Sequence, residues 1–330
     1  MDPARAAAGG EIPALPRLLP DYLRLCMNSV SREGDPMKKN TERFFPYGMT
    51  LPALFILLCL SLFPILYLLF YSFTDFRLLG KTHPSFIGFQ NYARILRDPY
   101  FLQSLRNTVL FTVLAVLSET ILGLLMALLI NGVRFGAKVL RILVLLPTLL
   151  PGVTAALTWQ LMLSNNYGVI NKMLAALGAA PVNWLMETRT AFYAILFIDI
   201  WQFSPFAFLL LYAALQTVPE SQYEAAQMDG AGSLQQFFYV TLPNIRPALL
   251  LTAMLRTIDT FRLFDKVNIL TKGGPANSTA TITQYIYLNG IRSLKIGYGG
   301  AASILMTVFV LALSFLYLAR TFHKRKPAGF

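Results

Sequence analysis

The sequence predicts an all-α protein that crosses a membrane six times. Its 330 residues are 55% hydrophobic and only 13% charged, with a mean hydropathy of +0.55, whereas soluble domains carry about 25% charged residues. The apolar residues gather into six stretches, each long enough to span about 30 Å of hydrocarbon as a helix. We expect these membrane-spanning helices at residues 50–73, 107–131, 142–163, 191–215, 247–270 and 299–318.

The first four spans differ in what interrupts them. The first carries no charged residue and contains Pro64, which can kink it. The second and fourth each contain one carboxylate, Glu119 and Asp199, and the third contains Pro147 and Pro151. Ionisable groups at membrane depth are costly, so they usually face a bundle interior or a water-filled path. The two carboxylates therefore indicate either interhelical contacts or contacts with a passing solute.

Basic residues flank both ends of the membrane domain, which we place at residues 46–320. Six spans put both termini on one side, and Lys38, Lys39 and Arg43 precede the first span while a basic tail at 321–330 follows the last. Since positive residues accumulate on the cytoplasmic side, both termini are predicted to be cytoplasmic. The external loop after the first span also carries several arginines and lysines, against this rule.

The N-terminal residues 1–45 form a predicted cytoplasmic extension. They contain no long apolar run, and the first apolar stretch lies too far along the chain and is too long for a cleavable signal. Met37 and the basic residues after it look like a natural start. We expect residues 1–36 to be dispensable for function.

One polar stretch, residues 217–243, separates the fourth span from the fifth. Thr217 with Glu220, and Ser233 with Gln236, have the spacing of capping boxes, in which a hydroxyl and a carboxylate or amide satisfy the first N–H groups of a helix. The pattern predicts two short helices joined by a turn, held at the membrane surface.

The residue types in this stretch also predict where the two helices end and which charges they carry. Gly230 ends the first helix, because glycine adopts a left-handed cap without strain, and Pro243 ends the second. An amphipathic loop lying on anionic lipid would favour basic residues. The charges here are acidic, at Glu220, Glu224 and Asp229. Acidic charge indicates docking on another protein.

The same stretch contains a spaced motif: Glu224-Ala225-Ala226, Gly230, and Val240 followed by Leu242-Pro243. This motif resembles the EAA loop of permease subunits in binding-protein-dependent ABC importers. A second run, residues 264–279, resembles the carbohydrate branch of that family, the maltose-type and glycerol-phosphate-type permeases. Together the resemblance covers roughly residues 46–320, and one position departs from it, with Val240 where isoleucine is usual.

This resemblance implies the partners and the place of the protein. It implies a bacterial inner-membrane subunit that works with a second, usually different, permease subunit, two cytoplasmic ATPases and an external solute-binding protein. The chain would bind membrane lipid and a sugar, with ATP and Mg on the ATPases and no cofactor of its own. The residues implied to couple it to the ATPases are Glu224, Ala225, Ala226, Asp229, Gly230, Leu242 and Pro243. Gly273-Gly274-Pro275 either touches the binding protein or forms a simple turn.

The fifth span carries the residues that could line a substrate path. Arg256, Asp259 and Arg262 follow one another at spacings of three, so they neighbour each other on one helix side. They either neutralise each other or line the path, together with Glu119 and Asp199. Trp201 lies near Asp199 and could stack on a sugar ring, although residues two apart do not share a helix face.

Those arginines bear on which sugar is carried. Arginine binds carboxylate in a bidentate manner, so Arg256 and Arg262 would suit an acidic sugar such as a uronate oligomer. Their aspartate neighbours would offset that charge, so the residues favour an acidic sugar only slightly over a neutral oligosaccharide.

Other function classes are excluded or lack support. The net charge of +12 does not indicate nucleic acid, since the basic residues flank spans instead of forming a patch with stacking aromatics. Residues 80–82 read Gly-Lys-Thr, but Asp75 stands where a phosphate-binding loop needs glycine. With only His83 and His323, no histidine-based catalytic site is credible, and the chain is not expected to be an enzyme. The alternative to an ABC permease is an ion-coupled carrier or channel acting alone, with the charged fifth span as its ion path.

Overall fold

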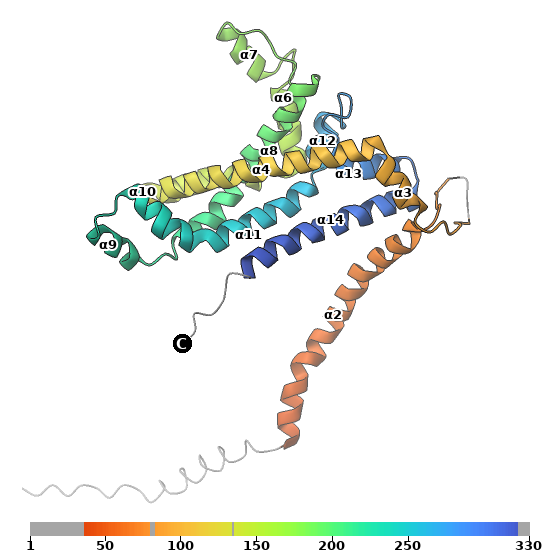
Figure 1. Cartoon of the computed structure of the whole chain (residues 1–330), viewed down its shortest axis with the longest axis horizontal. Coiled ribbons are helices and arrows are strands. Elements are labelled where there is room, and N and C mark those ends of the chain that lie inside the picture. Colours follow the sequence, from red (N-terminus) through yellow and green to blue (C-terminus); the bar gives the residue numbers. More distant parts are fainter. Residues whose placement is uncertain (1–35, 80–82, 134, 323–330) are drawn as a thin grey trace, which may run out of the picture. The chain divides into compact units, whose positions relative to one another are not determined.

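The protein is built from helices. The computed structural model describes residues 36–79, 83–133 and 135–322, and within them it contains no strand, only one isolated bridge between Thr74 and Phe86. The predicted all-α membrane fold is confirmed (Figure 1). In chain order the α-helices are α2 Pro36–Ser72, α3 Gln90–Arg97, α4 Pro99–Asn131, α5 Ala137–Leu145, α6 Gly152–Met162, α7 Val169–Ala176, α8 Thr188–Leu215, α9 Glu220–Met228, α10 Ser233–Gln236, α11 Leu242–Phe261, α12 Asp265–Leu270, α13 Ile282–Ile286 and α14 Ile296–Phe322. Three shorter turns complete the set: the 3₁₀ turn η2 Leu146–Leu149 and the π-helical turns η3 Phe237–Thr241 and η4 Tyr287–Arg292.

The described residues contain five helices that are long and apolar enough to cross a membrane, or six if one bent pair counts as a span. The bent pair is Ala137–Leu149 with Gly152–Met162, whose halves meet at 91°. The third span, predicted at 142–163, is therefore not a straight helix. Pro147 lies in the 3₁₀ turn and Pro151 lies just before α6, so the missing N–H groups of two prolines interrupt the helical hydrogen bonds.

The second span begins eight residues before the predicted start at Asn107. Asp98 caps α4 by accepting a hydrogen bond from the backbone N–H of Tyr100 at 2.9 Å, and Pro99 occupies the first turn, where its missing N–H costs nothing. Hydropathy alone did not reveal this start, because the first turns of α4 are polar.

The fifth span also differs from the predicted range 247–270. A helical run begins at Ser233, passes through η3 into α11, and is interrupted after Phe261 before α12 continues to Leu270. The interruption is a tight turn, in which the N–H of Arg262 bonds to the carbonyl of Asp259 at 3.0 Å. This break separates the charged residues that the sequence had placed on one helix.

The chain divides into two units, residues 1–66 and 67–330, which we describe separately. In the first, α2 exposes large apolar side chains, among them Leu51, Phe55 and Phe63, as a lipid-facing helix does. The predicted extension at 1–45 and the basic tail at 321–330 lie largely outside the described residues.

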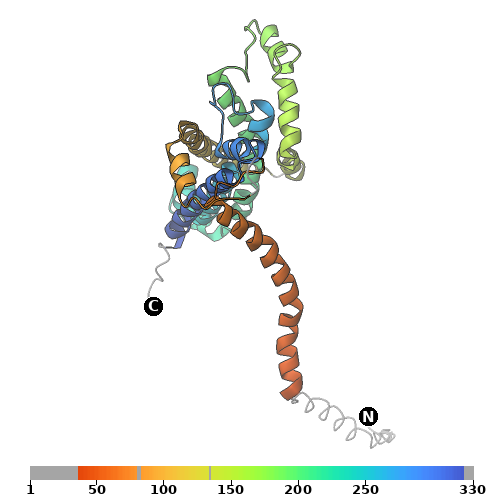
Figure 2. The same cartoon turned by 90° about the vertical axis from the view of Figure 1, so that its right-hand side faces the viewer.

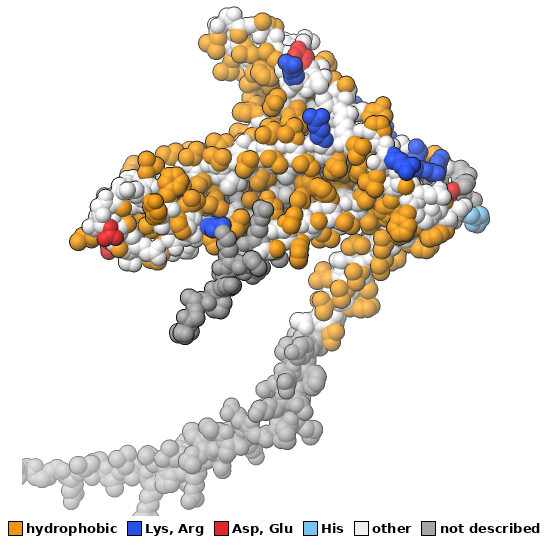
Figure 3. Space-filling model, in the orientation of Figure 1, with side chains coloured by type: hydrophobic (Ala, Val, Ile, Leu, Met, Phe, Trp, Pro, Cys, Tyr) orange, Lys and Arg blue, Asp and Glu red, His pale blue; other side chains and the backbone are white. Residues whose placement is uncertain are grey.

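In the second unit, α4 and α8 form the central helix pair, with α11 beside both and α14 against α11 (Figure 1). A Cβ atom added to Gly123 of α4 would lie 2.6 Å from the Cβ of Ala207 on α8, so only glycine allows this close approach. Apolar side chains cover the length of the bundle (Figure 3), as a membrane-embedded surface requires.

Candidate functional site

The polar stretch after α8 forms a helical hairpin at one end of the bundle, which we call the coupling hairpin (α9 and α10, residues 220–236; Figure 1). Gly230 ends α9 in a left-handed conformation with φ of +77°. The N–H of Ala231 then bonds back to the carbonyl of Ala226 at 2.9 Å, which closes the helix end. The predicted stop at Gly230 is confirmed.

The two predicted capping boxes are wrong. The hydroxyl of Thr217 donates to the carbonyl of Ala214 at 2.8 Å, because Thr217 still belongs to the last turn after α8, and α9 begins only at Glu220. Ser233 lies inside α10. The N–H of Gly232 donates instead to Oε1 of Gln235 at 2.9 Å, one residue earlier than predicted.

The prediction that Pro243 ends the second helix is also wrong. Pro243 lies in the first turn of α11, and the π-helical turn η3 immediately before it carries the helical run onward. Pro243 lacks the N–H that a continuous helix would pair with the preceding turn, and the π-helical turn at this point lets the run continue without that hydrogen bond. The coupling hairpin is therefore continuous with a membrane-spanning helix.

Side-chain hydrogen bonds brace the hairpin against the start of α11. The hydroxyls of Tyr223 and Thr241 lie 2.9 Å apart, and Nδ2 of Asn244 donates to Oε1 of Gln222 at 2.7 Å. These bonds join α9 to the helical run of α10, η3 and α11 at two points, so the hairpin and α11 can move as one piece.

The residues implied to couple the chain to an ATPase lie on the surface of this hairpin. Glu224, Ala225, Asp229, Gly230 and Pro243 are exposed, while Ala226 and Leu242 are half-buried.

The hairpin and the η3 turn after it also expose large apolar side chains. Met228 is 89% exposed, Leu234 75% and Tyr239 81%. Large apolar side chains exposed in this way are typical of interaction surfaces.

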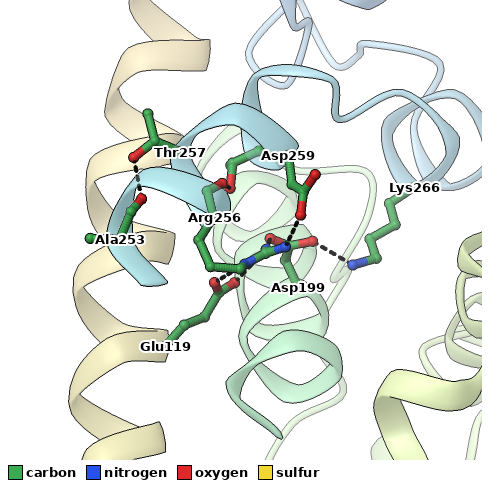
Figure 4. A network of polar contacts seen from close by, with 8 residues as sticks. Glu119, Asp199, Ala253, Arg256, Thr257, Asp259 and Lys266 are labelled. Carbon is green, nitrogen blue, oxygen red and sulfur yellow. Dashed lines mark hydrogen bonds and ion pairs between the residues drawn. The ribbon is translucent and has the colours of Figure 1, made fainter. Parts of the chain in front are cut away.

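A buried charge cluster joins four helices inside the bundle (Figure 4). Nε of Arg256 on α11 lies 2.6 Å from Oε2 of Glu119 on α4, and a second guanidinium nitrogen lies 3.1 Å from Oε1 of the same carboxylate. That second nitrogen lies 3.4 Å from Oδ2 of Asp199 on α8, whose other oxygen pairs with Lys266 of α12. We call Glu119, Asp199, Arg256 and Lys266 the charge cluster.

An aromatic ring completes the charge cluster. The guanidinium carbon of Arg256 lies 4.0 Å from the centre of the Phe203 ring, and Nζ of Lys266 lies 4.5 Å from it. Both cations are thereby attracted to the same ring. Neither Phe203 nor Lys266 was predicted as a residue of this site. A signal for Phe203 was present, since it follows Asp199 by four residues and so shares its helix face.

The charge cluster is electrically balanced and closed to solvent. Its two carboxylates and two cations have side chains at most 3% exposed. Asp259, 3.5 Å from Arg256 and 56% exposed, lies at its rim. Of the two interpretations of Glu119 and Asp199, the structure shows interhelical contacts, because Arg256 binds both carboxylates.

Two other residues predicted for the substrate path lie apart from the cluster. Arg262 is exposed at the end of α11, and Trp201 packs edge-on against Trp159 at 5.4 Å between ring centres. The structure thus brings Glu119, Asp199, Arg256 and Asp259 together and leaves Arg262 and Trp201 outside. That any of them contacts substrate stays a prediction.

The glycine-rich loop after α12 closes on itself. Gly273, with φ of +91°, is buried, and the carbonyl of Gly274 accepts a hydrogen bond from the Thr279 hydroxyl at 2.8 Å. Asn107 of α4 anchors the loop by donating to the carbonyl of Asn277 at 2.9 Å. A contact of Gly273, Gly274 or Pro275 with a binding protein stays a prediction. No group of side chains suited to a metal ion occurs among the described residues.

Comparison with known proteins decides the family. Residues 119–326 match the family of binding-protein-dependent transport system inner membrane components. The chain belongs to this family. The match runs from Glu119 of the charge cluster through the coupling hairpin to the end of α14, so both candidate sites lie within it.

Relatives of this permease are sugar-transport permeases. It is 40% identical over 280 residues to the trehalose/maltose transport system permease protein MalF of Thermococcus litoralis, covering 85% of this chain and 94% of the relative. It is 35% identical to the sulfoquinovosyl glycerol transport system permease protein SmoG of Agrobacterium fabrum, covering 84% of this chain and 90% of the relative. The resemblance to the carbohydrate branch is confirmed.

A solved structure shares the fold. A chain of a bacterial ABC transporter involved in the import of the acidic polysaccharide alginate superposes with a TM-score of 0.76, covering 88% of this permease and 100% of that chain. At 24% identity this likeness concerns the fold alone. A second solved structure with the same TM-score of 0.76 is of a bacterial alginate ABC transporter in complex with an alginate pentasaccharide-bound periplasmic protein.

Proposed function

We propose that this permease is the membrane-spanning subunit of an ABC importer for an oligosaccharide or related sugar. Its partners are a second, different permease subunit, two cytoplasmic ATPases and an external solute-binding protein. The names of the relatives support a sugar, and the family description supports dependence on a binding protein. ATP and Mg bind on the ATPases, and this chain contributes no cofactor site.

One observation carries the proposal: the coupling hairpin runs without interruption into the helix that holds the charge cluster. The helical run from Ser233 through α11 ends at Phe261, and Arg256 lies near its far end. Arg256 is bound to α4 and α8 through Glu119 and Asp199. A force applied to the hairpin is therefore passed to three helices together.

This continuity supports a mechanism for transport. When the ATPases close on ATP, they displace the hairpin, in which Glu224 pairs with basic or hydrogen-bonding groups of the ATPase. The alanines Ala225 and Ala226 permit close approach, and Gly230 sets the angle between α9 and α10. Because α11 carries α4 and α8 with it, the bundle rocks as a body and exchanges inward for outward access.

The topology that fits this mechanism has six spans. Counting the bent pair of α5 and α6 as one span gives an even number, which keeps both termini on the cytoplasmic side. The coupling hairpin then lies in the cytoplasm, where ATPases can meet it. The opposite end of the bundle, with α3 and the start of α14, is external.

The charge of the sugar is not set by Arg256. Its guanidinium is buried and neutralised by Glu119 and Asp199, so it is not free to bind a substrate carboxylate in this structure. This removes one of the two arginines on which an acidic sugar was predicted, and only the exposed Arg262 remains. Neutral and acidic oligosaccharides are equal candidates.

The test is ATP hydrolysis by the reconstituted complex, with its binding protein, across a panel of neutral and acidic oligosaccharides. Stimulation by members of the panel, with no uptake by this chain alone, supports the proposal. Uptake by this chain alone that collapses when the proton or sodium gradient is dissipated would instead establish an ion-coupled carrier.

A further inference from the structure

The end of the bundle opposite the coupling hairpin carries a pocket that the proposed function has not used. It measures about 340 Å³ and is lined by the loop after α2, by α3 and by the residues around the start of α14. A second pocket of about 520 Å³ adjoins it, and the two share Asp98 and Asn289. Figure 2 views the bundle from this end, and Figure 3 shows basic side chains gathered there.

The wall of this pocket is held by backbone hydrogen bonds between distant segments. The N–H of Leu78 bonds to the carbonyl of Leu294 at 3.0 Å, and the N–H of Gly297 bonds to the carbonyl of Phe76 at 3.0 Å. Nδ2 of Asn91, a buried residue of α3, donates to the carbonyl of Thr74 at 2.8 Å. The pocket is therefore preformed, because these bonds tie its three lining segments together.

Three cations line the pocket from three different segments: Arg77 from the loop, Arg94 from α3, and Lys295 just before α14. We call Arg77, Arg94 and Lys295, with the space between them, the basic pocket. None of the three makes an ion pair with another residue in the described part of the chain. Arg292 adds a fourth cation in the adjoining pocket.

The two acids of the basic pocket accept hydrogen bonds that hold the fold together. Oδ1 of Asp98 accepts from the N–H of Tyr100 at 2.9 Å, and its Oδ2 accepts from the hydroxyl of Tyr285 at 2.5 Å. Burial and this hydrogen bond raise the pKa of Tyr285 above its ordinary value, so the hydroxyl stays protonated and remains a donor. Asp75 accepts from the N–H of Ser85 at 2.7 Å. Both carboxylates therefore serve the fold, and because three cations face two carboxylates, the pocket is net positive.

The position of this charge is unusual for a membrane protein. In the proposed topology the basic pocket is external, whereas lysine and arginine normally accumulate on the cytoplasmic side. The pocket also lies at the end of the bundle, away from the buried charge cluster of the membrane interior. An external pocket in which cations outnumber carboxylates fits an anionic partner that arrives from outside.

We propose that the basic pocket receives carboxylate side chains of the solute-binding protein and docks it by electrostatic attraction. This inference rests on the proposed function, since it needs a binding protein to be the partner. Exposed charges at the rim of an interface act mainly on the rate of encounter and on its salt dependence. Arg77 and Arg94 are exposed and suit that role, while the half-buried Lys295 lies deeper and suits a direct contact.

The experiment compares two pairs of charge reversals at this end of the molecule. The test pair is Arg94→Glu with Lys295→Glu, both in the basic pocket. The matched control pair is Arg97→Glu with Arg106→Glu, which are exposed and line neither pocket. Both pairs change the charge by the same amount.

The assay uses the complete transporter in nanodiscs and titrates the cognate sugar-loaded binding protein while ATP hydrolysis is measured. The test pair should raise the binding-protein concentration for half-maximal stimulation about tenfold or more, with the plateau rate unchanged, because rim charges act on association. This shift should shrink as salt rises from about 50 mM to about 300 mM, where the screening length falls below about 10 Å. The control pair should shift the half-maximal concentration far less. The charge-conserving pair Arg94→Lys with Lys295→Arg should keep the wild-type half-maximal concentration.

Three results would overturn docking at the basic pocket. The first is an equal shift in the test and control pairs, which would mean a general charge effect. The second is an unchanged half-maximal concentration with a lower plateau, which would assign the cations to the transport step or the sugar. The third is a shift seen only in nanodiscs containing phosphatidylglycerol, which would assign them to lipid headgroups. Failure of the proposed function is separate, since the wild-type transporter itself would then show no stimulation.

Discussion

Removing Arg256 should lower the free energy of unfolding strongly. Removing the charge of its partner Glu119 as well should restore most of the lost stability. The substitution Arg256→Met leaves Glu119, Asp199 and Lys266 with a net charge of −1 in a site whose side chains are at most 3% exposed. Breaking a buried ion pair in this way costs about 3–5 kcal/mol, because it leaves an uncompensated buried charge. The double variant Glu119→Gln with Arg256→Met is neutral again, since Asp199 still pairs with Lys266.

The measurement is the free energy of unfolding of the detergent-solubilised protein, followed by circular dichroism as SDS is added. We expect the single variant to lose about 3–5 kcal/mol and the double variant to recover at least half of it. Coupling energies between residues in direct contact reach about 0.5–3 kcal/mol in such cycles. Asp259→Asn is the matched control: this carboxylate touches the same guanidinium but is 56% exposed, so its loss should cost less than about 1 kcal/mol.

Two outcomes would refute this reasoning. If the double variant is as unstable as Arg256→Met alone, the side chain matters for its packing and not for charge balance. If Arg256→Met unfolds like the wild type, water or lipid headgroups reach the carboxylates, and the charge cluster is not the closed site described here.

Four further predictions concern packing, coupling and the aromatic ring. Gly123→Ala should cost about 1–3 kcal/mol, because its new Cβ would lie 2.6 Å from the nearest atom of α8; Gly132→Ala, with a nearest atom at 3.7 Å, is the control and should be close to neutral in the same SDS titration. Glu224→Lys should leave the protein inserted and ATP hydrolysis running while uptake is lost, and wild-type uptake would contradict the coupling role. Gly230→Val should behave likewise because its φ of +77° disfavours branched residues, whereas Gly230→Asn, which tolerates that conformation, should transport. Phe203→Leu should lower the free energy of unfolding by about 1–3 kcal/mol through the loss of two cation–π contacts, while Phe203→Tyr should retain it.

Several features of the fold could be read directly from local sequence. Long apolar stretches require helices in lipid, since every backbone N–H and C=O must be satisfied within the segment, and this predicted the all-α class and most spans. Gly230 marked the end of α9 because its conformation is a property of one residue. The coupling hairpin was recognisable for the same reason, as a local run of residues with its own turn.

Other features of the fold could not be predicted from the sequence, because they depend on which of several neighbouring groups forms a hydrogen bond. Thr217 had the spacing of a capping residue, but its hydroxyl bonds back to the preceding helix instead. Pro243 has the chemistry of a helix breaker, but the π-helical turn before it lets the helix continue. A pattern of residue types does not show which of two available partners a polar group takes.

The charge cluster shows what the sequence by itself does not determine. From the sequence we could tell that Glu119, Asp199 and Arg256 are costly in a membrane and need partners. Which partners they take was decided only by the tertiary structure, because the three residues lie on α4, α8 and α11, up to 137 positions apart in the chain. Helix propensity and membrane insertion are local and therefore readable from sequence. Charge pairing across helices depends on how the helices pack, and packing is a property of the whole bundle.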